Sequence, residues 1–72
     1  MEVNVPKLKE LRRRRVLSLR ELEEESGVSY ATVWRLESGR SSRAHPRTIR
    51  KLARALGVDT AELVANTEVE DD

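Results

Sequence analysis

Cysteine is absent from this chain of 72 residues, and its only aromatic residues are Tyr30 and Trp34. Without cysteine the chain can form neither a disulfide framework nor a thiolate metal site. No apolar run approaches the roughly 18 residues that span a bilayer, and the first residues, MEVNVPKLKE, lack the apolar middle of a secretory signal. We therefore expect one small cytoplasmic domain with no membrane partner and little room for an enclosed substrate pocket.

Charge is distributed unevenly along the chain. The 14 lysine and arginine residues nearly balance the 13 acidic residues, but four of the acids lie within Glu68–Asp72. Up to Asn66, 14 basic residues stand against 9 acidic ones, a net charge of +5. A basic domain suits a polyanionic partner; the alternative is that these charges only keep a small helical domain soluble. We predict a folded domain over residues 1–65 and a disordered acidic tail over residues 66–72.

The spacing of the apolar residues predicts short helices joined by turns. Pro6 stands where a helix begins, and Leu8 and Leu11 follow it as an apolar pair three residues apart. A second helix opens with a capping box, in which Ser18 caps an amide of the first turn and Glu21 reaches back to the Ser18 amide. This helix is short, about two turns.

A third helix follows the second almost at once. Gly27 suits the left-handed residue that ends a helix, and Ser29 is a natural N-cap for the next one. Val33 and Leu36 supply its inward apolar pair, and Gly39 ends it. Two short helices joined by a turn of this kind are typical of a helix-turn-helix.

A fourth helix starts at Pro46 and carries the apolar spacing of a buried face at Ile49, Leu52, Ala53 and Leu56. Asp59 and Glu62 repeat the capping-box spacing and predict a short fifth helix. No segment alternates between apolar and polar residues over a useful length. The sequence therefore predicts an all-α fold of five helices.

The outward side of the third helix differs from its inward side. At 100° per residue, Ala31 and Arg35 point away from the apolar pair, Trp34 lies nearer to them than to the core, and Tyr30 lies on the flank. A large exposed apolar group on a small domain usually contacts a partner. In a helix-turn-helix the second helix enters the major groove of DNA and reads bases from its N-terminal half.

Longer motifs strengthen this interpretation. LRRRRVLSLRELEEESGVSYATVWRLESGR, followed by TIRKLARALGVDTAELV, resembles the Cro/repressor type of lambda-repressor-like helix-turn-helix family over Leu8–Val64. The matching motifs are LR at 11–12, LS at 17–18, GVS at 27–29, LESG at 36–39 and LARALGV at 52–58. The resemblance implies a compact five-helix, nucleoid-associated regulator that binds double-stranded operator DNA as a homodimer. We expect a repressor and a palindromic operator.

Two positions depart from the family pattern. Leu19 stands where the family often has a glutamine that contacts phosphate, and Glu23 stands where a small residue usually lets the second and third helices pack closely. At the first position, backbone amides and the positive end of the helix remain to hold a phosphate, aided by Arg20. These departures concern the details of binding more than the fold.

Five residues of the third helix are predicted to contact bases: Tyr30, Ala31, Thr32, Trp34 and Arg35. An arginine can bind guanine through two hydrogen bonds, an aromatic ring can touch a thymine methyl group, and a bare alanine lets the helix approach closely. Each has a plainer alternative. Arg35 can be a solvated surface residue, Tyr30 and Trp34 can pack partly against neighbouring segments, and Thr32 can face the second helix.

A second group is predicted to contact the phosphate backbone, as the resemblance and the charges suggest. The group comprises Arg14, Arg15, Leu19 (through its backbone), Arg20, Ser29, Arg40, Ser41, Ser42 and Arg43. The alternatives are a solvated basic face for residues 12–15, a helix cap for Ser29 and an ordinary polar loop for residues 40–43.

Catalytic and metal-binding constellations are missing from the sequence. His45 precedes a proline and has no ligand partner at metal spacing, and residues 23–25 form a single run of glutamates without a second carboxylate cluster. There is no glycine-rich phosphate loop. We predict no enzyme, no cofactor and no metal site.

One rival function uses the same fold. An antitoxin or other protein-binding module can cover a basic partner with Glu68–Asp72 and present Tyr30 and Trp34 to it. For the expected homodimer, the candidate surfaces are residues 44–47 and the last helix, residues 60–65.

Overall fold

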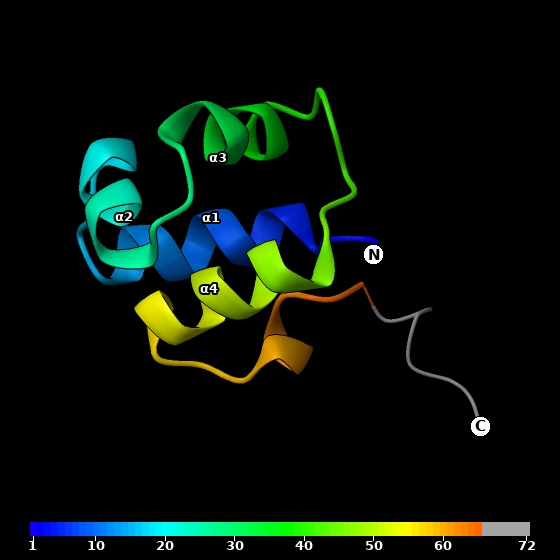
Figure 1. Cartoon of the computed structure of the whole chain (residues 1–72). Coiled ribbons are helices and arrows are strands. Elements are labelled where there is room, and N and C mark those ends of the chain that lie inside the picture. The colour runs from blue at the N-terminus through cyan, green and yellow to red at the C-terminus, as the bar shows by residue number, and fades with distance from the viewer. Residues whose placement is uncertain (66–72) are drawn as a thin grey trace.

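The computed structural model describes Met1–Ala65, and every regular element in that range is helical (Figure 1). The α-helices are α1 (Val5–Arg14), α2 (Leu19–Ser26), α3 (Tyr30–Glu37) and α4 (Pro46–Leu56), and a 3₁₀ turn, η1 (Thr60–Glu62), follows them. None of these helices is long and apolar enough to cross a bilayer. The prediction of an all-α fold is confirmed. The acidic tail predicted for residues 66–72 lies outside the described residues.

The helices surround one core. In Figure 1, α1 runs through the middle, α3 and α4 lie on opposite sides of it, and α2 lies near its C-terminal end. Helix α2 packs against both α3 and α4. The core is built from the residues that the apolar spacing places inward, together with Val3, Val28 and Leu63. Its helical members are Leu8, Leu11, Leu22, Val33, Leu36, Ile49, Leu52, Ala53 and Leu56.

Side-chain caps fix where α1 and α2 begin. Asn4 Oδ1 accepts a hydrogen bond from the Lys7 amide at 3.2 Å. The capping box predicted at the start of α2 is confirmed: Ser18 Oγ accepts from the Glu21 amide at 3.0 Å, and Glu21 Oε1 accepts from the Ser18 amide at 2.8 Å. These bonds satisfy amides that have no partner inside the helix.

The turn between α2 and α3 has the predicted construction. Gly27 ends α2 with a φ of +80°, in the left-handed region that favours glycine. Ser29 Oγ then caps α3 by accepting from the Ala31 amide at 3.1 Å. At α4, the imidazole of His45 is itself the cap, because its Nδ1 accepts from the Arg47 amide at 3.1 Å. A structural role for His45 was not predicted.

The fifth predicted helix is only one 3₁₀ turn, and the capping box predicted for it is wrong. The Asp59 side chain makes no capping hydrogen bond. The backbone that would continue a helix is engaged elsewhere, since the Leu63 carbonyl accepts from the Asn4 amide at 2.8 Å and Val64 pairs with Val3. A long-range pairing thus prevents the helix that the local spacing favours.

The N-terminal residues join two distant parts of the chain. The Met1 ammonium donates to the Ala44 carbonyl at 2.8 Å, and the Val3 amide donates to the Ser42 carbonyl at 2.7 Å. On the other side, the Ala65 amide donates to the Glu2 carbonyl at 2.9 Å. These bonds hold the loop that follows α3 against the body of the domain.

Candidate nucleic-acid interface

Helix α3 has a buried face and an exposed face, as the 100° spacing predicts. Val33 and Leu36 are buried, with 0% and 1% of their surface exposed. Tyr30 and Trp34 retain 40% and 46%, and Ala31 and Arg35 are exposed as well. Thr32 is half-buried. The outward side of α3 therefore combines two aromatic rings, a bare alanine and an arginine, whereas its inward side belongs to the core.

Each aromatic ring of this face carries an arginine. The Arg20 guanidinium, which belongs to α2, lies 4.4 Å from the centroid of the Tyr30 ring. The Arg40 guanidinium, from the loop after α3, lies 5.3 Å from the centroid of the Trp34 ring. Such cation–π pairs stabilise exposed side chains by about 0.5–1 kcal/mol. They hold one cation against each ring, an arrangement that the sequence spacing did not reveal.

Arg35 follows Trp34 on the outward side of α3. Its guanidinium makes no hydrogen bond or ion pair with any residue of Met1–Ala65 and is exposed. Its backbone carbonyl, in contrast, accepts from the Arg40 amide at 3.0 Å and the Ser41 amide at 3.2 Å. This carbonyl thus folds the following loop back onto the end of α3, while the guanidinium of the same residue stays available to a ligand.

An ion pair that was not predicted anchors the end of α3. Arg12 of α1 donates from Nε to Glu37 Oε2 at 2.7 Å and from Nη2 to Glu37 Oε1 at 2.8 Å. Arg12 Nη1 also donates to the Leu17 carbonyl at 2.6 Å. The hydrogen bonds to Glu37 raise the pKa of Arg12 and outweigh desolvation, which lowers it. Helix α3 is thereby fixed to α1 by an ion pair with two hydrogen bonds.

The predicted phosphate contacts near α3 lie at its start and in the loop after its end. Ser29 lies at the N-terminus of α3, where its hydroxyl serves as a cap. In the loop that follows, Arg40, Ser42 and Arg43 are exposed and Ser41 is half-buried. Arg43 Nη1 lies 3.2 Å from Glu2 Oε1, an exposed pair. Exposed pairs of this kind hold their partners weakly and leave them able to bind a phosphate.

At the start of α2, the Leu19 side chain packs partly on the core, so that only its backbone amide can serve a phosphate. The Glu21 carboxylate lies at the same helix end through its bond to the Ser18 amide. This carboxylate already occupies part of the positive helix end, which leaves Arg20 as the main cation there. Arg14 is exposed and pairs with Glu10 one turn back along α1, at 2.6 Å.

Arg15, which was also predicted to contact phosphate, contacts α4 and the end of α2. Its Nη1 donates to the Ala55 carbonyl on α4 at 2.8 Å, and its Nη2 lies 3.6 Å from Glu25 Oε1. Figure 1 shows α4 across α1 from α3. The contacts of Arg15 thus draw it toward α4, and we leave it out of the proposed interface.

No group of three or more histidine, cysteine or acidic residues within the described range is placed to hold a metal ion. A groove of about 160 Å³ lies between the N-terminus, α4 and the segment after η1, and it is smaller than the ~300 Å³ at which small-molecule sites begin. A second hollow of about 370 Å³, beside Met1, Arg43 and Pro46, is wide open to solvent and does not enclose a ligand as small-molecule sites do. The exposed face of α3 is therefore the feature of Met1–Ala65 best suited to a large ligand.

A short helix, a glycine turn and a second helix with a basic, aromatic outward face define a DNA-binding helix-turn-helix domain of the Cro/repressor type. The chain belongs to the helix-turn-helix domain family, whose profile matches residues 7–65. It is similar to the crystal structure of the restriction-modification controller protein C.AhdI from Aeromonas hydrophila, with 33% identity and a TM-score of 0.74. That match covers 81% of this chain and 86% of the other.

Two proteins of Bacillus subtilis are similar as well. The N-terminal DNA-binding domain of SinR has a TM-score of 0.76 over 79% of this chain and 83% of that one, at 23% identity, which shows the fold. The uncharacterized HTH-type transcriptional regulator RghRB of strain 168 is 43% identical over 58 residues. This match covers 81% of the chain but 42% of RghRB, so the chain spans less than half the length of that relative.

Proposed function

We propose that the chain is a transcriptional repressor that binds a palindromic operator as a two-fold dimer, with α3 in the major groove. The observation that carries the proposal is the free, exposed Arg35 guanidinium on a helix whose two aromatic rings each carry an arginine. A helix with this outward face fits the ~12 Å width of the major groove. An arginine whose two outer nitrogens are unpaired can donate both to O6 and N7 of a guanine.

The other residues of the proposed interface form two sets, one for the bases and one for the phosphates. Tyr30, Ala31, Thr32 and Trp34 lie on the same helix as Arg35 and complete the base-contacting set, in which Thr32 is half-buried and the other three are exposed. The phosphate-contacting set lies around α3 and at the start of α2. It comprises Arg14, the Leu19 amide, Arg20, Ser29, Arg40, Ser41, Ser42 and Arg43. Phosphate contacts fix the position of the domain and base contacts supply sequence preference.

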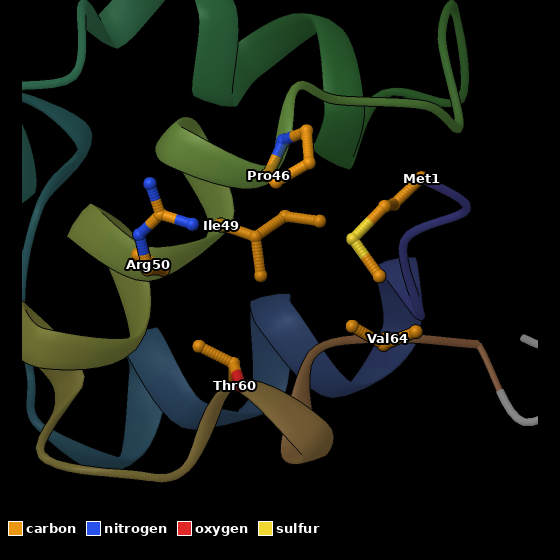
Figure 2. Close-up of a pocket in the computed structure, with 6 residues that line it drawn as sticks. All are labelled: Met1, Pro46, Ile49, Arg50, Thr60 and Val64. Atoms are coloured by element: carbon orange, nitrogen blue, oxygen red, sulfur yellow. The ribbon is translucent and has the colours of Figure 1, made fainter. Parts of the chain in front are cut away.

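A dimer follows from the small number of base contacts that one α3 offers, because two half-sites about one DNA turn apart supply adequate specificity. The proposed dimer surface is the groove of Figure 2, where Met1, Ile49 and Val64 present apolar groups to one another. Pro46, Arg50 and Thr60 complete the lining. Pro46 and Thr60 lie in the two segments, 44–47 and 60–65, where dimer contacts are expected from the sequence. Sedimentation equilibrium with and without operator DNA tests this surface, and a monomer in both samples would count against it.

Binding selection from random duplex DNA tests the function directly. The enriched sequence is then titrated with the wild type, Arg35→Ala and Arg54→Ala at two salt concentrations. We expect an enriched palindrome whose preferred base is lost in Arg35→Ala, at a cost of about 1–3 kcal/mol. Arg54→Ala is the matched control, an exposed arginine on α4, and it keeps the base preference.

The other outcomes of the selection are equally informative. Salt-dependent binding without enrichment would leave only phosphate contacts and remove the claim of base recognition. Absence of binding to any duplex would overturn the repressor and favour a protein partner on the face around Trp34.

A further inference from the structure

Helix α4 carries a basic stripe that the DNA-binding face does not use. Arg47, Arg50, Lys51 and Arg54 follow the spacing i, i+3, i+4, i+7, and all of them are exposed. They lie opposite the buried residues of the same helix. The helix contains no acidic residue at all, so the stripe is a continuous surface of four like charges.

Like charges at this spacing destabilise a helix. Some surface cations elsewhere in the domain have acidic partners: Lys7 pairs with Glu62, Arg14 with Glu10 and Arg43 with Glu2. None of the four stripe side chains forms an ion pair within Met1–Ala65. The stripe is therefore a repulsive arrangement that an external anion would stabilise, and its occupant must be acidic.

The acidic occupant available within the chain is Glu68–Asp72. These five residues carry four acidic side chains, which match the four cations of the stripe. The rest of the chain contains both basic and acidic residues, whereas this segment contains no basic residue. Charge complementarity thus pairs the last segment of the chain with the stripe.

Position supports the same pairing. Val64 and Arg50 line the same groove, so the described chain ends across this groove from one cation of the stripe (Figure 2). The seven residues after Ala65 can extend roughly 24 Å at about 3.4 Å per residue. Helix α4 has 11 residues and is about 16 Å long. The acidic segment can therefore reach every cation of the stripe in its own chain.

We propose that the basic stripe of α4 is a docking surface for the chain's own acidic segment, Glu68–Asp72, which screens it from other polyanions. The functional consequence concerns nonspecific binding. An uncovered stripe would bind phosphates of any sequence, because electrostatic contacts supply essentially all of nonspecific DNA affinity. With the stripe covered, phosphate binding is confined to the side of the domain where α3 reads bases.

Paramagnetic relaxation tests the docking without any DNA. The chain has no cysteine, so a nitroxide on Asp72→Cys is a unique label that leaves three carboxylates in the segment. We expect the label to broaden amide signals of residues 47–54 more than those of α3, and the broadening to fall at least twofold in 0.5 M NaCl as exposed charges are screened. Stronger broadening over α3, or equal broadening on all helices, would overturn the proposal.

A matched variant and a mixed sample complete this experiment. Neutralising the stripe with Arg50→Gln, Lys51→Gln and Arg54→Gln changes only exposed residues, and it should abolish the broadening of α4. Persistent broadening in a variant with an unchanged thermal melt would contradict charge pairing. Spin-labelled chains at natural abundance are also mixed with unlabelled ¹⁵N chains. Broadening of α4 in that mixture would show that the segment covers a second copy and not its own chain.

The consequence for nonspecific binding has its own measurement. Neutralising the segment with Glu68→Gln, Glu70→Gln, Asp71→Asn and Asp72→Asn should strengthen binding to random duplex DNA. The slope of log affinity against log salt should steepen by about 0.9 for each additional phosphate that the stripe neutralises. The same four changes should have no such effect once the stripe itself is neutralised. An equal effect in both backgrounds would mean that the acidic segment does not act through the stripe.

Loss of operator recognition alone would count against the proposed function and not against the docking.

Discussion

The Arg12 guanidinium and the Glu37 carboxylate meet across the contact between α1 and α3 with little exposure, 14% for the arginine side chain and 7% for the glutamate. Two hydrogen bonds join them in parallel, the geometry in which arginine–carboxylate pairs are strongest and most directional. The same arginine also binds the Leu17 carbonyl before α2 begins. One side chain thus connects α1, the approach to α2 and the end of the proposed recognition helix, and it sets the direction in which α3 projects.

Removal of one partner from this pair should destabilise the domain strongly. Arg12→Ala leaves the Glu37 carboxylate nearly buried without a counter-ion. We expect the free energy of unfolding to fall by about 3 kcal/mol. In a domain of this size that lowers Tm by roughly 12–24 °C. Arg14→Ala is the control, since its pair with Glu10 is exposed and should contribute no more than about 0.5 kcal/mol.

A double variant separates the cost of an orphaned charge from the value of the pair. Arg12→Met with Glu37→Leu replaces both partners with apolar groups, and we expect it to be more stable than Arg12→Ala. Calorimetric melts of the three variants decide the point. A double variant less stable than Arg12→Ala would mean that orientation of α3 depends on the hydrogen bonds themselves.

Val16 occupies a backbone conformation that suits glycine. It has a φ of 55° and an exposed side chain at the end of α1. Its amide donates to the Arg13 carbonyl at 2.9 Å and the Leu17 amide to the Arg12 carbonyl at 3.2 Å, the pattern of a Schellman helix end, in which this residue is usually glycine. A β-branched residue is unfavourable there.

We therefore expect Val16→Gly to stabilise the domain by about 1 kcal/mol, because the left-handed conformation costs an L-residue about 1–2 kcal/mol and glycine loses part of that gain through its flexible unfolded state. Chemical denaturation measures the change. Val16→Ala is the control: it keeps the strained conformation and removes only exposed methyl groups, so it should give little gain. Equal stabilisation by both changes would assign the effect to loss of the exposed side chain.

Gly27 provides a second test of backbone conformation, this time at the turn of the helix-turn-helix. Its φ of +80° is left-handed, and no atom lies within 4 Å of the place where a Cβ would stand. Gly27→Ala should therefore destabilise the domain through backbone conformation alone, by about 1 kcal/mol, and Gly27→Asn by less. Thermal melts compare the two. If both variants lose several kcal/mol, the turn must be packed more tightly than the structure shows.

The helical faces could be predicted from the sequence because their spacing is local. The inward positions of α3 and α4 follow from residues three and four apart, and the caps at Ser18 and Ser29 depend on neighbours within one turn. The pair of Arg12 with Glu37 and the bonds of Met1 to Ala44 join residues 25 and 43 positions apart. No local pattern contains such contacts. The predicted fifth helix is only one 3₁₀ turn because another long-range bond, from the Asn4 amide, engages the Leu63 carbonyl.

The candidate interface shows the same contrast between features set by local spacing and features set by long-range packing. The exposure of Trp34 and Arg35 could be predicted from the helical wheel. The placing of Arg20 on Tyr30 and of Arg40 on Trp34 depends on how α2 and the loop after α3 fold against the helix. Likewise, Arg15 is one of four consecutive arginines, and only the packing of α4 shows which of them turns away from α3.

Arg35→Lys tests whether the proposed base contact requires the shape of the guanidinium or only its charge. Lysine keeps the positive charge on the exposed face of α3 but lacks the planar pair of donors that matches guanine O6 and N7. We expect the variant to lose the preference for the guanine, by about 1–3 kcal/mol, and to keep the salt dependence of the wild type, since the number of charges that meet DNA is unchanged. Titrations of the selected operator and of the same duplex with that guanine replaced, each at two salt concentrations, measure both quantities. If Arg35→Lys retained the preference in full, Arg35 would be acting as a point charge toward phosphate, and base recognition would have to come from Tyr30, Ala31 and Trp34 on the same face.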